Sequence, residues 1–243
     1  MKSELTGSTA LITGAGRGLG RAIARQLAEM GAAVAAADID GESAKETAGM
    51  VEELGPPAMA VEMDVSDEES VAAGVERVER EMGGFDILVN NAGIDRTVPI
   101  VELEPDQWRA VMGVNLDGPF YLCRHAFTLL AERHQSGHIV NVVSTAAKRA
   151  WANASAYHAS KWGLLGLSHA LHVEGRELGI GVTAVVAGGM RTPFILDRFP
   201  DVDVDTLQDP AGVARAVGFA LTCPPGTVIP ELMVIPTHES SWP

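Results

Sequence analysis

The sequence predicts an α/β fold, a doubly wound parallel sheet with helices on both faces. Short apolar runs alternate with longer stretches of helical periodicity along almost all of the 243 residues. The apolar runs are continuous rather than alternating, which is typical of strands buried on both faces of a parallel sheet. They predict seven strands, at Thr9–Thr13, Ala33–Asp38, Ala58–Met63, Ile87–Asn90, His138–Val143, Val182–Val186 and Val228–Ile235.

Helical periodicity fills the intervals between these runs. We expect helices near residues 18–30, 42–54, 67–82, 106–133, 155–178 and 210–222. No internal repeat, low-complexity segment or break in composition divides the chain, so we expect a single domain over residues 1–243. The longest irregular stretch, about 187–209, contains two adjacent glycines and two prolines, and it is a candidate for a mobile lid over a binding site.

The composition argues against several classes of function. The formal net charge is −14, and because nucleic-acid phosphates repel an acidic chain, we expect no nucleic-acid partner. Cys123 and Cys223 are far apart, and neither they nor the histidines show metal-ligand spacing, so we expect no metal site. The N-terminus lacks the apolar stretch of a signal peptide, and no apolar segment reaches the roughly 20 residues of a membrane span. We therefore expect a cytoplasmic protein without a membrane partner.

A glycine-rich turn follows the first predicted strand and leads directly into the first predicted helix. Its glycines, which include Gly14, Gly18 and Gly20, allow a tight turn and a close approach of the backbone to a ligand. The start of the helix offers N–H groups to a diphosphate. The turn therefore predicts a dinucleotide-binding site.

The end of the second predicted strand indicates which dinucleotide binds. Asp38 lies there, eighteen residues beyond Gly20, where a carboxylate accepts hydrogen bonds from both ribose hydroxyls of an adenosine. The same carboxylate repels a 2′-phosphate, so the sequence favours NAD over NADP. Arg17 in the glycine-rich turn argues for NADP, because its guanidinium is able to pair with a 2′-phosphate.

Tyr157 and Lys161 are about one helical turn apart and project from the same face of a predicted helix. An ammonium group beside a phenol favours the phenolate, so we expect Lys161 to lower the pKa of Tyr157 from about 10. A phenol tuned in this way exchanges a proton with an alcohol or a carbonyl near neutral pH. The pair therefore predicts an acid/base residue, although the same spacing occurs by chance in many helices.

Several motifs, taken in order, resemble those of the short-chain dehydrogenase/reductase family, and the resemblance covers about residues 6–235. They are the glycine-rich turn, two residues after the third strand, an Asn-Asn-Ala-Gly motif, a helix asparagine, and a serine thirteen residues before the tyrosine: Thr13–Gly20, Asp64 with Val65, Asn90–Gly93, Asn115 and Ser144. The resemblance implies a Rossmann fold, a nicotinamide cofactor, and the oxidation or reduction of a CH–OH group.

The resemblance also implies a role for individual residues. Tyr157 is expected to be the general acid/base, and Lys161 to hold the nicotinamide ribose. Ser144 is expected to bind the substrate oxygen, and Asn115 to hold a water molecule through its backbone. The residues expected to bind the cofactor are Gly14, Arg17, Gly18, Leu19, Gly20, Asp38, Asp64, Val65, Asn91, Ala92, Gly93, Tyr157, Lys161, Gly188 and Thr192.

One position departs from the family pattern. Ala187 replaces the proline that usually precedes the glycine after the sixth strand, while Gly188 and Thr192 keep the family spacing. Thr192 is therefore expected to contact the nicotinamide carboxamide. We expect a looser hinge at the start of the lid, because proline is lost beside two glycines.

The substrate pocket is expected beside the acid/base residue. Its residues mix polar and apolar side chains, and we expect them to be Ser144, Thr145, Asp95, Asn153, Met190 and Phe194. The helices predicted at 106–133 and 155–178 carry apolar residues on more than one face, so we also expect a homodimer or a homotetramer.

The sequence favours an oxidoreductase that transfers a hydride between NAD(H) and a small secondary alcohol or ketone. One alternative is an NADP-dependent ketoreductase of 3-oxoacyl or polyketide-type substrates. Another is a catalytically idle protein that senses NAD, but a pure binder needs no acid/base residue, and the four expected catalytic residues are all present. An epimerase or dehydratase uses the same four residues, and the sequence does not distinguish it.

Overall fold

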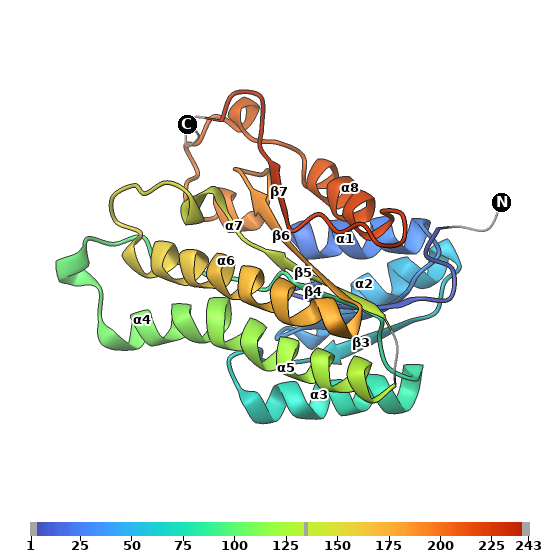
Figure 1. Cartoon of the computed structure of the whole chain (residues 1–243). Coiled ribbons are helices and arrows are strands. Elements are labelled where there is room, and N and C mark those ends of the chain that lie inside the picture. Colours follow the sequence, from blue (N-terminus) through green and yellow to red (C-terminus); the bar gives the residue numbers. More distant parts are fainter. Residues whose placement is uncertain (1–3, 134–135, 240–243) are drawn as a thin grey trace.

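A computed structural model describes residues 4–133 and 136–239 of the chain. Seven strands form one sheet in the order β3-β2-β1-β4-β5-β6-β7 (Figure 1). Every neighbouring pair of strands is parallel, which confirms the predicted sheet. The strands are β1 (Thr9–Thr13), β2 (Ala33–Asp38), β3 (Ala58–Glu62), β4 (Ile87–Asn90), β5 (Gly137–Val142), β6 (Ile180–Ala187) and β7 (Glu231–Val234).

Helices cover both faces of this sheet, as the sequence predicts. In Figure 1, α1, α2 and α8 lie on one side, and α3, α4, α5 and α6 lie on the other. The helices are α1 (Gly18–Glu29), α2 (Gly41–Leu54), α3 (Glu68–Met82), α4 (Pro105–Met112), α5 (Gly118–Glu132), α6 (Ser155–Gly175), α7 (Pro193–Leu196) and α8 (Pro210–Leu221).

Two layers of apolar side chains hold the helices to the sheet. Leu11 and Ile12 are neighbours in β1, and because alternate side chains of a strand point to opposite faces, they belong to different core clusters. Ile12 shares its cluster with Ile23 of α1, and Leu11 shares its cluster with Leu122 of α5. Each such buried side chain contributes about 1.5–3 kcal/mol. Burial on both faces explains why the strands read as continuous apolar runs.

The direction in which strands are added reverses at β1. This strand pairs with β2 on one side and with β4 on the other. The chain therefore adds β2 and β3 on one side of β1, and then adds β4 to β7 on the other side. A reversal of this kind opens a crevice at the carboxyl ends of the strands. Thr13 ends β1 and Asn90 ends β4, so the residues that follow them lie at the crevice.

The seventh strand is shorter than predicted, Glu231–Val234 instead of Val228–Ile235, and three further segments differ from the sequence prediction. The stretch predicted as one helix over 106–133 consists of α4, a π-helical turn at Gly113–Asp117, and α5. The helix predicted over 155–178 ends at Gly175, and a 3-10 turn follows it. The stretch predicted as irregular over 187–209 contains α7 and a 3-10 turn at Val204–Thr206. Apolar periodicity misses these features because a single wider or tighter turn barely changes the spacing of apolar residues.

Candidate active site

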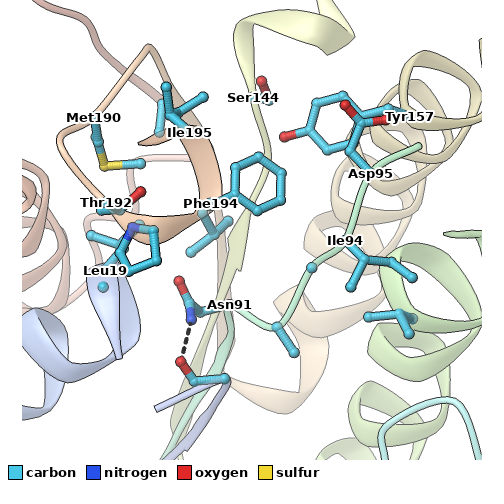
Figure 2. Close-up of a pocket in the computed structure, with 18 of the residues that line it drawn as sticks. Leu19, Asn91, Ile94, Asp95, Ser144, Tyr157, Met190, Thr192, Phe194 and Ile195 are labelled. Carbon is cyan, nitrogen blue, oxygen red and sulfur yellow. Dashed lines mark hydrogen bonds between the residues drawn. The ribbon is translucent and has the colours of Figure 1, made fainter. Parts of the chain in front are cut away.

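A cavity of about 620 Å³ lies at the crevice between the strand ends. Its walls come from the glycine-rich turn before α1, the segments after β2, β3, β4 and β5, the helix α6, and the chain after β6. Figure 2 shows part of this lining, with Ser144 and Tyr157 on one side and Leu19, Met190 and Thr192 on the other. Parts of the chain that are distant in sequence thus meet around one space.

The glycine-rich turn has a backbone that only glycine adopts without strain. Gly14 and Gly18 have φ angles of 59° and 56°, in the left-handed region. A Cβ on Gly20 would lie 2.0 Å from the carbonyl oxygen of Gly14, and one on Gly16 would lie 2.8 Å from a carboxylate oxygen of Asp38. The turn is therefore closed tightly against α1 and β2, and its backbone is open toward the cavity.

Asn91 fixes this turn from the neighbouring strand. Its side-chain amide donates to the carbonyl oxygens of Thr13 and Gly14, at 2.9 and 3.0 Å. The hydroxyl of Thr13 accepts in return from the backbone N–H groups of Asn91 and Ala92, both at 3.1 Å. These bonds join the ends of β1 and β4, and Asn91, Ala92 and Gly93 line the cavity.

The acidic residues after β2 and β3 also reach the cavity. Asp38 accepts hydrogen bonds from the backbone N–H groups of Gly16 (2.8 Å) and Asp40 (3.0 Å), which hold its carboxylate at the wall. Asp64 and Val65 line the same wall, and Asp64 accepts from the backbone N–H of Ser66. Arg17 lies at the cavity with its side chain largely exposed, 3.8 Å from the carboxylate of Asp197.

Tyr157 and Ser144 meet across the cavity from different elements. Tyr157 lies in the first turn of α6 and is 8% exposed, while Ser144 follows β5 and accepts from the backbone N–H of Ala146 at 3.1 Å. Figure 2 shows the phenolic oxygen of Tyr157 pointing into the cavity on the side of Ser144. The two hydroxyl groups are therefore placed to contact one ligand oxygen.

The protonation of Tyr157 differs from the sequence prediction. Burial raises the pKa of Tyr157 to about 12; the charge of Asp95 acts in the same direction, while Ser144 and Arg198 act against it. Lys161 is not among these influences: its Nζ donates to the carbonyl oxygen of Val142 at 2.9 Å and lies 5.8 Å from the centroid of the Tyr157 ring. Burial lowers the pKa of Lys161 to about 8. The prediction that Lys161 lowers the pKa of Tyr157 is therefore wrong for this structure.

Asn115 supports the site from behind the cavity wall. The π-helical turn turns its side chain inward, where it is completely buried. Its amide accepts from the backbone N–H of Ile94 at 2.8 Å and donates to the Ile94 carbonyl at 2.8 Å and to the Ser160 hydroxyl at 3.0 Å. Asn115 thereby ties the segment after β4 to α6, and it does not line the cavity itself.

The chain after β6 is anchored more firmly than the missing proline predicts. The backbone N–H of Gly188 donates to the carbonyl of Val234 in β7 at 2.9 Å. The backbone N–H of Gly189 donates to the carboxylate of Glu239 at 3.0 Å. Both glycines line the cavity, so the C-terminal segment holds the start of the predicted lid in place.

Most of the expected site residues are brought together, and a few are not. Thr145, Asp95, Met190, Phe194 and Thr192 line the cavity. Three expected residues lie outside its lining: Asn115, Gly20, which closes the turn, and Asn153, which is exposed with a φ of 67°.

The cavity also contains residues that the sequence does not single out. Arg198 pairs with the carboxylate of Asp95, and Trp151 and Glu239 belong to the lining. Arg198 is 103 positions from Asp95, and Glu239 is 50 positions from Gly189. No spacing rule connects residues so far apart.

The structure fits a dinucleotide and shows no metal centre in its described part. Among residues 4–133 and 136–239, no group of three His, Cys, Asp or Glu side chains is placed to hold a metal ion. Over the same residues, none of the helices is both long and apolar enough to cross a membrane. The glycine cradle beside Asp38 and the N-terminus of α1 at the cavity match a nucleotide cofactor.

Comparison with curated proteins identifies relatives of this chain. The model of the short chain dehydrogenase family matches residues 8–202. The 3beta-hydroxysteroid dehydrogenase 1 of Eggerthella lenta is 38% identical over 202 residues, which cover 83% of this chain and 77% of that protein. The cis-4-hydroxycyclohexanecarboxylate dehydrogenase of Sinomonas cyclohexanicum is 36% identical over 235 residues, covering 93% and 94%.

Solved structures give the same result. The 3-ketoacyl-(acyl-carrier-protein) reductase of Brucella melitensis, complexed with NADH, has a TM-score of 0.86 and 32% identity, covering 96% of this chain and 98% of that one. A metagenomic short-chain oxidoreductase in complex with NADP has a TM-score of 0.84 and 33% identity, covering 97% and 100%. The chain therefore belongs to the short-chain dehydrogenase family, and it is an oxidoreductase that acts on CH–OH groups with a nicotinamide cofactor.

Proposed function

We propose that this protein interconverts a small secondary alcohol and its ketone with NAD(H). The observation that carries the proposal is the placement of Tyr157 and Ser144 in the same cavity as the glycine cradle and Asp38. An acid/base group and a hydrogen-bonding hydroxyl are what carbonyl chemistry beside a dinucleotide requires. A protein that only senses NAD has no use for this pair.

The chemistry follows from the positions of the two hydroxyl groups. Ser144 donates a hydrogen bond to the substrate oxygen and orients it toward Tyr157. In reduction, the phenol of Tyr157 donates its proton to the developing alkoxide; in oxidation, the phenolate takes the proton of the alcohol. A bound nicotinamide supplies the hydride chemistry, and its oxidised form adds a positive charge that favours the phenolate.

The raised pKa of Tyr157 has a direct consequence for this mechanism. Because burial raises that pKa to about 12, the phenol is protonated at neutral pH and ready to act as the acid in ketone reduction. Lys161 lines the same cavity as Tyr157, and we propose that it binds a ribose hydroxyl of the cofactor there. Asn115 keeps α6 in register with the segment after β4.

Asp38 supports NAD as the cofactor. Two backbone N–H groups fix its carboxylate at the cavity wall, where it faces the expected position of the adenosine ribose. A 2′-phosphate at about 4 Å would be repelled by on the order of 4 kcal/mol at intermediate dielectric. Arg17 is exposed and next to Asp197, so it compensates this repulsion only weakly.

We propose a cyclic secondary alcohol as the substrate class. The names of the two relatives, a 3beta-hydroxysteroid dehydrogenase and a cis-4-hydroxycyclohexanecarboxylate dehydrogenase, denote alcohols carried on rings. The substrate end of this cavity offers Trp151, Phe194 and Ile94 as apolar contacts for a ring. Residues 187–209 would close over it as a lid, since Phe194 lies 5.8 Å from the Tyr157 ring between centroids.

We further propose that the chain forms a homodimer or homotetramer. Large apolar side chains are exposed on neighbouring helices: Trp108 on α4, Phe120 on α5 and Trp162 on α6. A second copy of the chain would bury them. Both cysteines are unpaired, which suits a reducing compartment such as the cytoplasm.

The direct test is turnover on a panel of cyclic and open-chain secondary alcohols and ketones, followed by absorbance at the nicotinamide band with either cofactor. We expect activity on cyclic compounds with a higher kcat/KM for NAD(H) than for NADP(H). Tight NADH binding without turnover on any compound would favour an NAD sensor instead. A strong preference for NADPH would favour the ketoreductase alternative.

A further inference from the structure

Asp95 carries a buried carboxylate oxygen without a hydrogen-bond partner in the described part of the chain. The side chain of Asp95 follows β4 and is 6% exposed. Its Oδ2 accepts from Arg198 and, at 3.1 Å, from the hydroxyl of Thr97. Its Oδ1 is buried and has no hydrogen-bond partner among the residues that the structure describes. A buried acceptor without a donor costs free energy, so this atom is a place where a ligand donor would be bound favourably.

Asp95 belongs to the substrate end of the cavity. Asp95 lines the cavity together with Tyr157 and Ser144. Figure 2 shows Asp95 beside the Tyr157 ring, away from Leu19, Met190 and Thr192. Burial raises the pKa of the Tyr157 phenol, and the negative charge of Asp95 raises this pKa further. A substrate whose oxygen reaches Tyr157 would therefore have Asp95 within the same cavity.

Arg198 determines the kind of donor that fits. Its guanidinium pairs with Asp95, donates from Nε to the carbonyl of Phe194 at 2.7 Å, and stacks 4.0 Å above the Phe194 ring. Because Arg198 already compensates the charge of Asp95, the site does not need a cationic ligand. The facing carboxylate disfavours an anion. An uncharged donor, such as a hydroxyl group, matches the remaining oxygen.

We propose that Asp95 is a specificity residue that binds a second hydroxyl group of the substrate through Oδ1, so that this enzyme prefers hydroxylated ring alcohols, such as cyclic diols, over alcohols without a second donor. The inference rests on the proposed function only in that the other hydroxyl group is the one oxidised. Trp151, Phe194 and Ile94 line the same cavity and would contact the ring between the two hydroxyl groups.

The test measures binding rather than turnover. The NADH-loaded enzyme is titrated with cyclohexane-1,2-diol, 1,3-diol and 1,4-diol, and with their monomethyl ethers, and Kd is obtained by ligand-observed NMR. No oxidation takes place with NADH, so the result does not depend on activity. We expect at least one diol to bind about tenfold more tightly than its ether, the size of effect expected for a hydrogen bond to a charged group.

Substitution then assigns the preference to Asp95. In Asp95→Asn the carboxylate becomes a neutral amide with only one acceptor oxygen, and in Asp95→Ala the carboxylate is removed. Both substitutions should reduce the preference to less than about threefold. Asp106→Asn removes a fully exposed carboxylate on α4 and should leave the preference intact. Thermal melting of each variant confirms that it is folded.

The outcomes separate the inference from the proposed function. Equal binding of every diol and its ether, no binding of any diol, or a preference that survives in both Asp95 variants would overturn the inference. A diol that binds through Asp95 but is not oxidised with NAD would support the inference and contradict the proposed function. Oxidation of cyclohexanol without any preference for diols would support the proposed function and contradict the inference.

Discussion

The Nζ of Lys161 lies 5.8 Å from the centroid of the Tyr157 ring and donates its hydrogen bond to the backbone of Val142 instead of the phenol. Two other side chains act on the phenol through their charge: Asp95 raises the pKa of Tyr157, and Arg198 lowers it. Burial has the largest effect on this pKa, and the charges of Asp95 and Arg198 adjust it. These two side chains form an ion pair between the segment after β4 and the predicted lid, which the sequence did not indicate.

This arrangement predicts opposite pH shifts for the two partners. Asp95→Asn removes a negative charge that disfavours the phenolate, so the inflection of kcat/KM assigned to Tyr157 should move to lower pH. Arg198→Met removes a positive charge that favours the phenolate, so the inflection should move to higher pH. Shifts in the same direction, or no shift in either variant, would contradict the account. Asp106→Asn serves as the control for a change of net charge.

Asp38 should determine which dinucleotide binds. Asp38→Asn keeps the size of the side chain and removes the charge that repels a 2′-phosphate. We expect the ratio of Kd for NADPH to Kd for NADH, measured by fluorescence titration, to fall by at least about tenfold, or about 1.4 kcal/mol. An unchanged ratio would show that Asp38 does not face the adenosine ribose.

Two glycines, Gly20 beside the glycine-rich turn and Gly49 in α2, give a matched pair of substitutions. In Gly20→Ala the new Cβ would meet the Gly14 carbonyl at 2.0 Å, so we expect a loss of about 1–3 kcal/mol in unfolding free energy and weaker NADH binding. Gly49 lies in α2, where an added methyl group would have nothing within 4 Å, and Gly49→Ala should stabilise by about 0.5–1 kcal/mol. Denaturant unfolding of both variants checks the contrast, and equal effects would refute it.

His138 should make stability depend on pH. Its Nε2 lies 2.8 Å from the Thr183 hydroxyl, and burial, with a smaller contribution from His172, lowers the pKa of His138 to about 4. The unfolded chain takes up a proton near pH 6.5 and the folded chain does not, so stability falls as the pH drops from 6.5 toward 4. The loss over this window is on the order of 3 kcal/mol.

The matched variant is His138→Gln, whose amide is able to donate to the same hydroxyl without titrating. We expect the unfolding free energy of the variant to fall less than that of the wild type between pH 6.5 and 4.5. Parallel curves for the two proteins would show that His138 is not the group responsible.

Much of the fold follows from patterns that are local in the sequence. Continuous apolar runs predict all seven strands, because each strand is buried on both faces, as Leu11 and Ile12 illustrate. The turn at Gly113–Asp117 is missed because it keeps the helical spacing of its neighbours. What the wider turn changes is the direction of the Asn115 side chain, which depends on packing against Ile94 and Ser160.

The site is predictable to the extent that its residues follow strand ends. Asp38, Asn91 and Ser144 lie where parallel strands finish, and such ends meet at one edge of the sheet. Arg198 and Glu239 reach the cavity from segments whose path is set by tertiary contacts. The prediction that Asn153 lines the substrate pocket is wrong, although this residue is near Tyr157 in the sequence. Asn153 has a left-handed backbone conformation and is exposed at the surface.

The central claim is that Tyr157 exchanges the substrate proton, and the two tyrosines of this chain allow a controlled test. Tyr121 lies on α5 beside Phe120 and outside the cavity. The measurement is turnover of a cyclic secondary alcohol by Tyr157→Phe and Tyr121→Phe, with Kd for NADH measured on the same samples. We expect Tyr157→Phe to lose about 10²–10⁴-fold in kcat with NADH affinity largely retained, and Tyr121→Phe to retain both. Turnover by Tyr157→Phe at the wild-type rate would contradict the account.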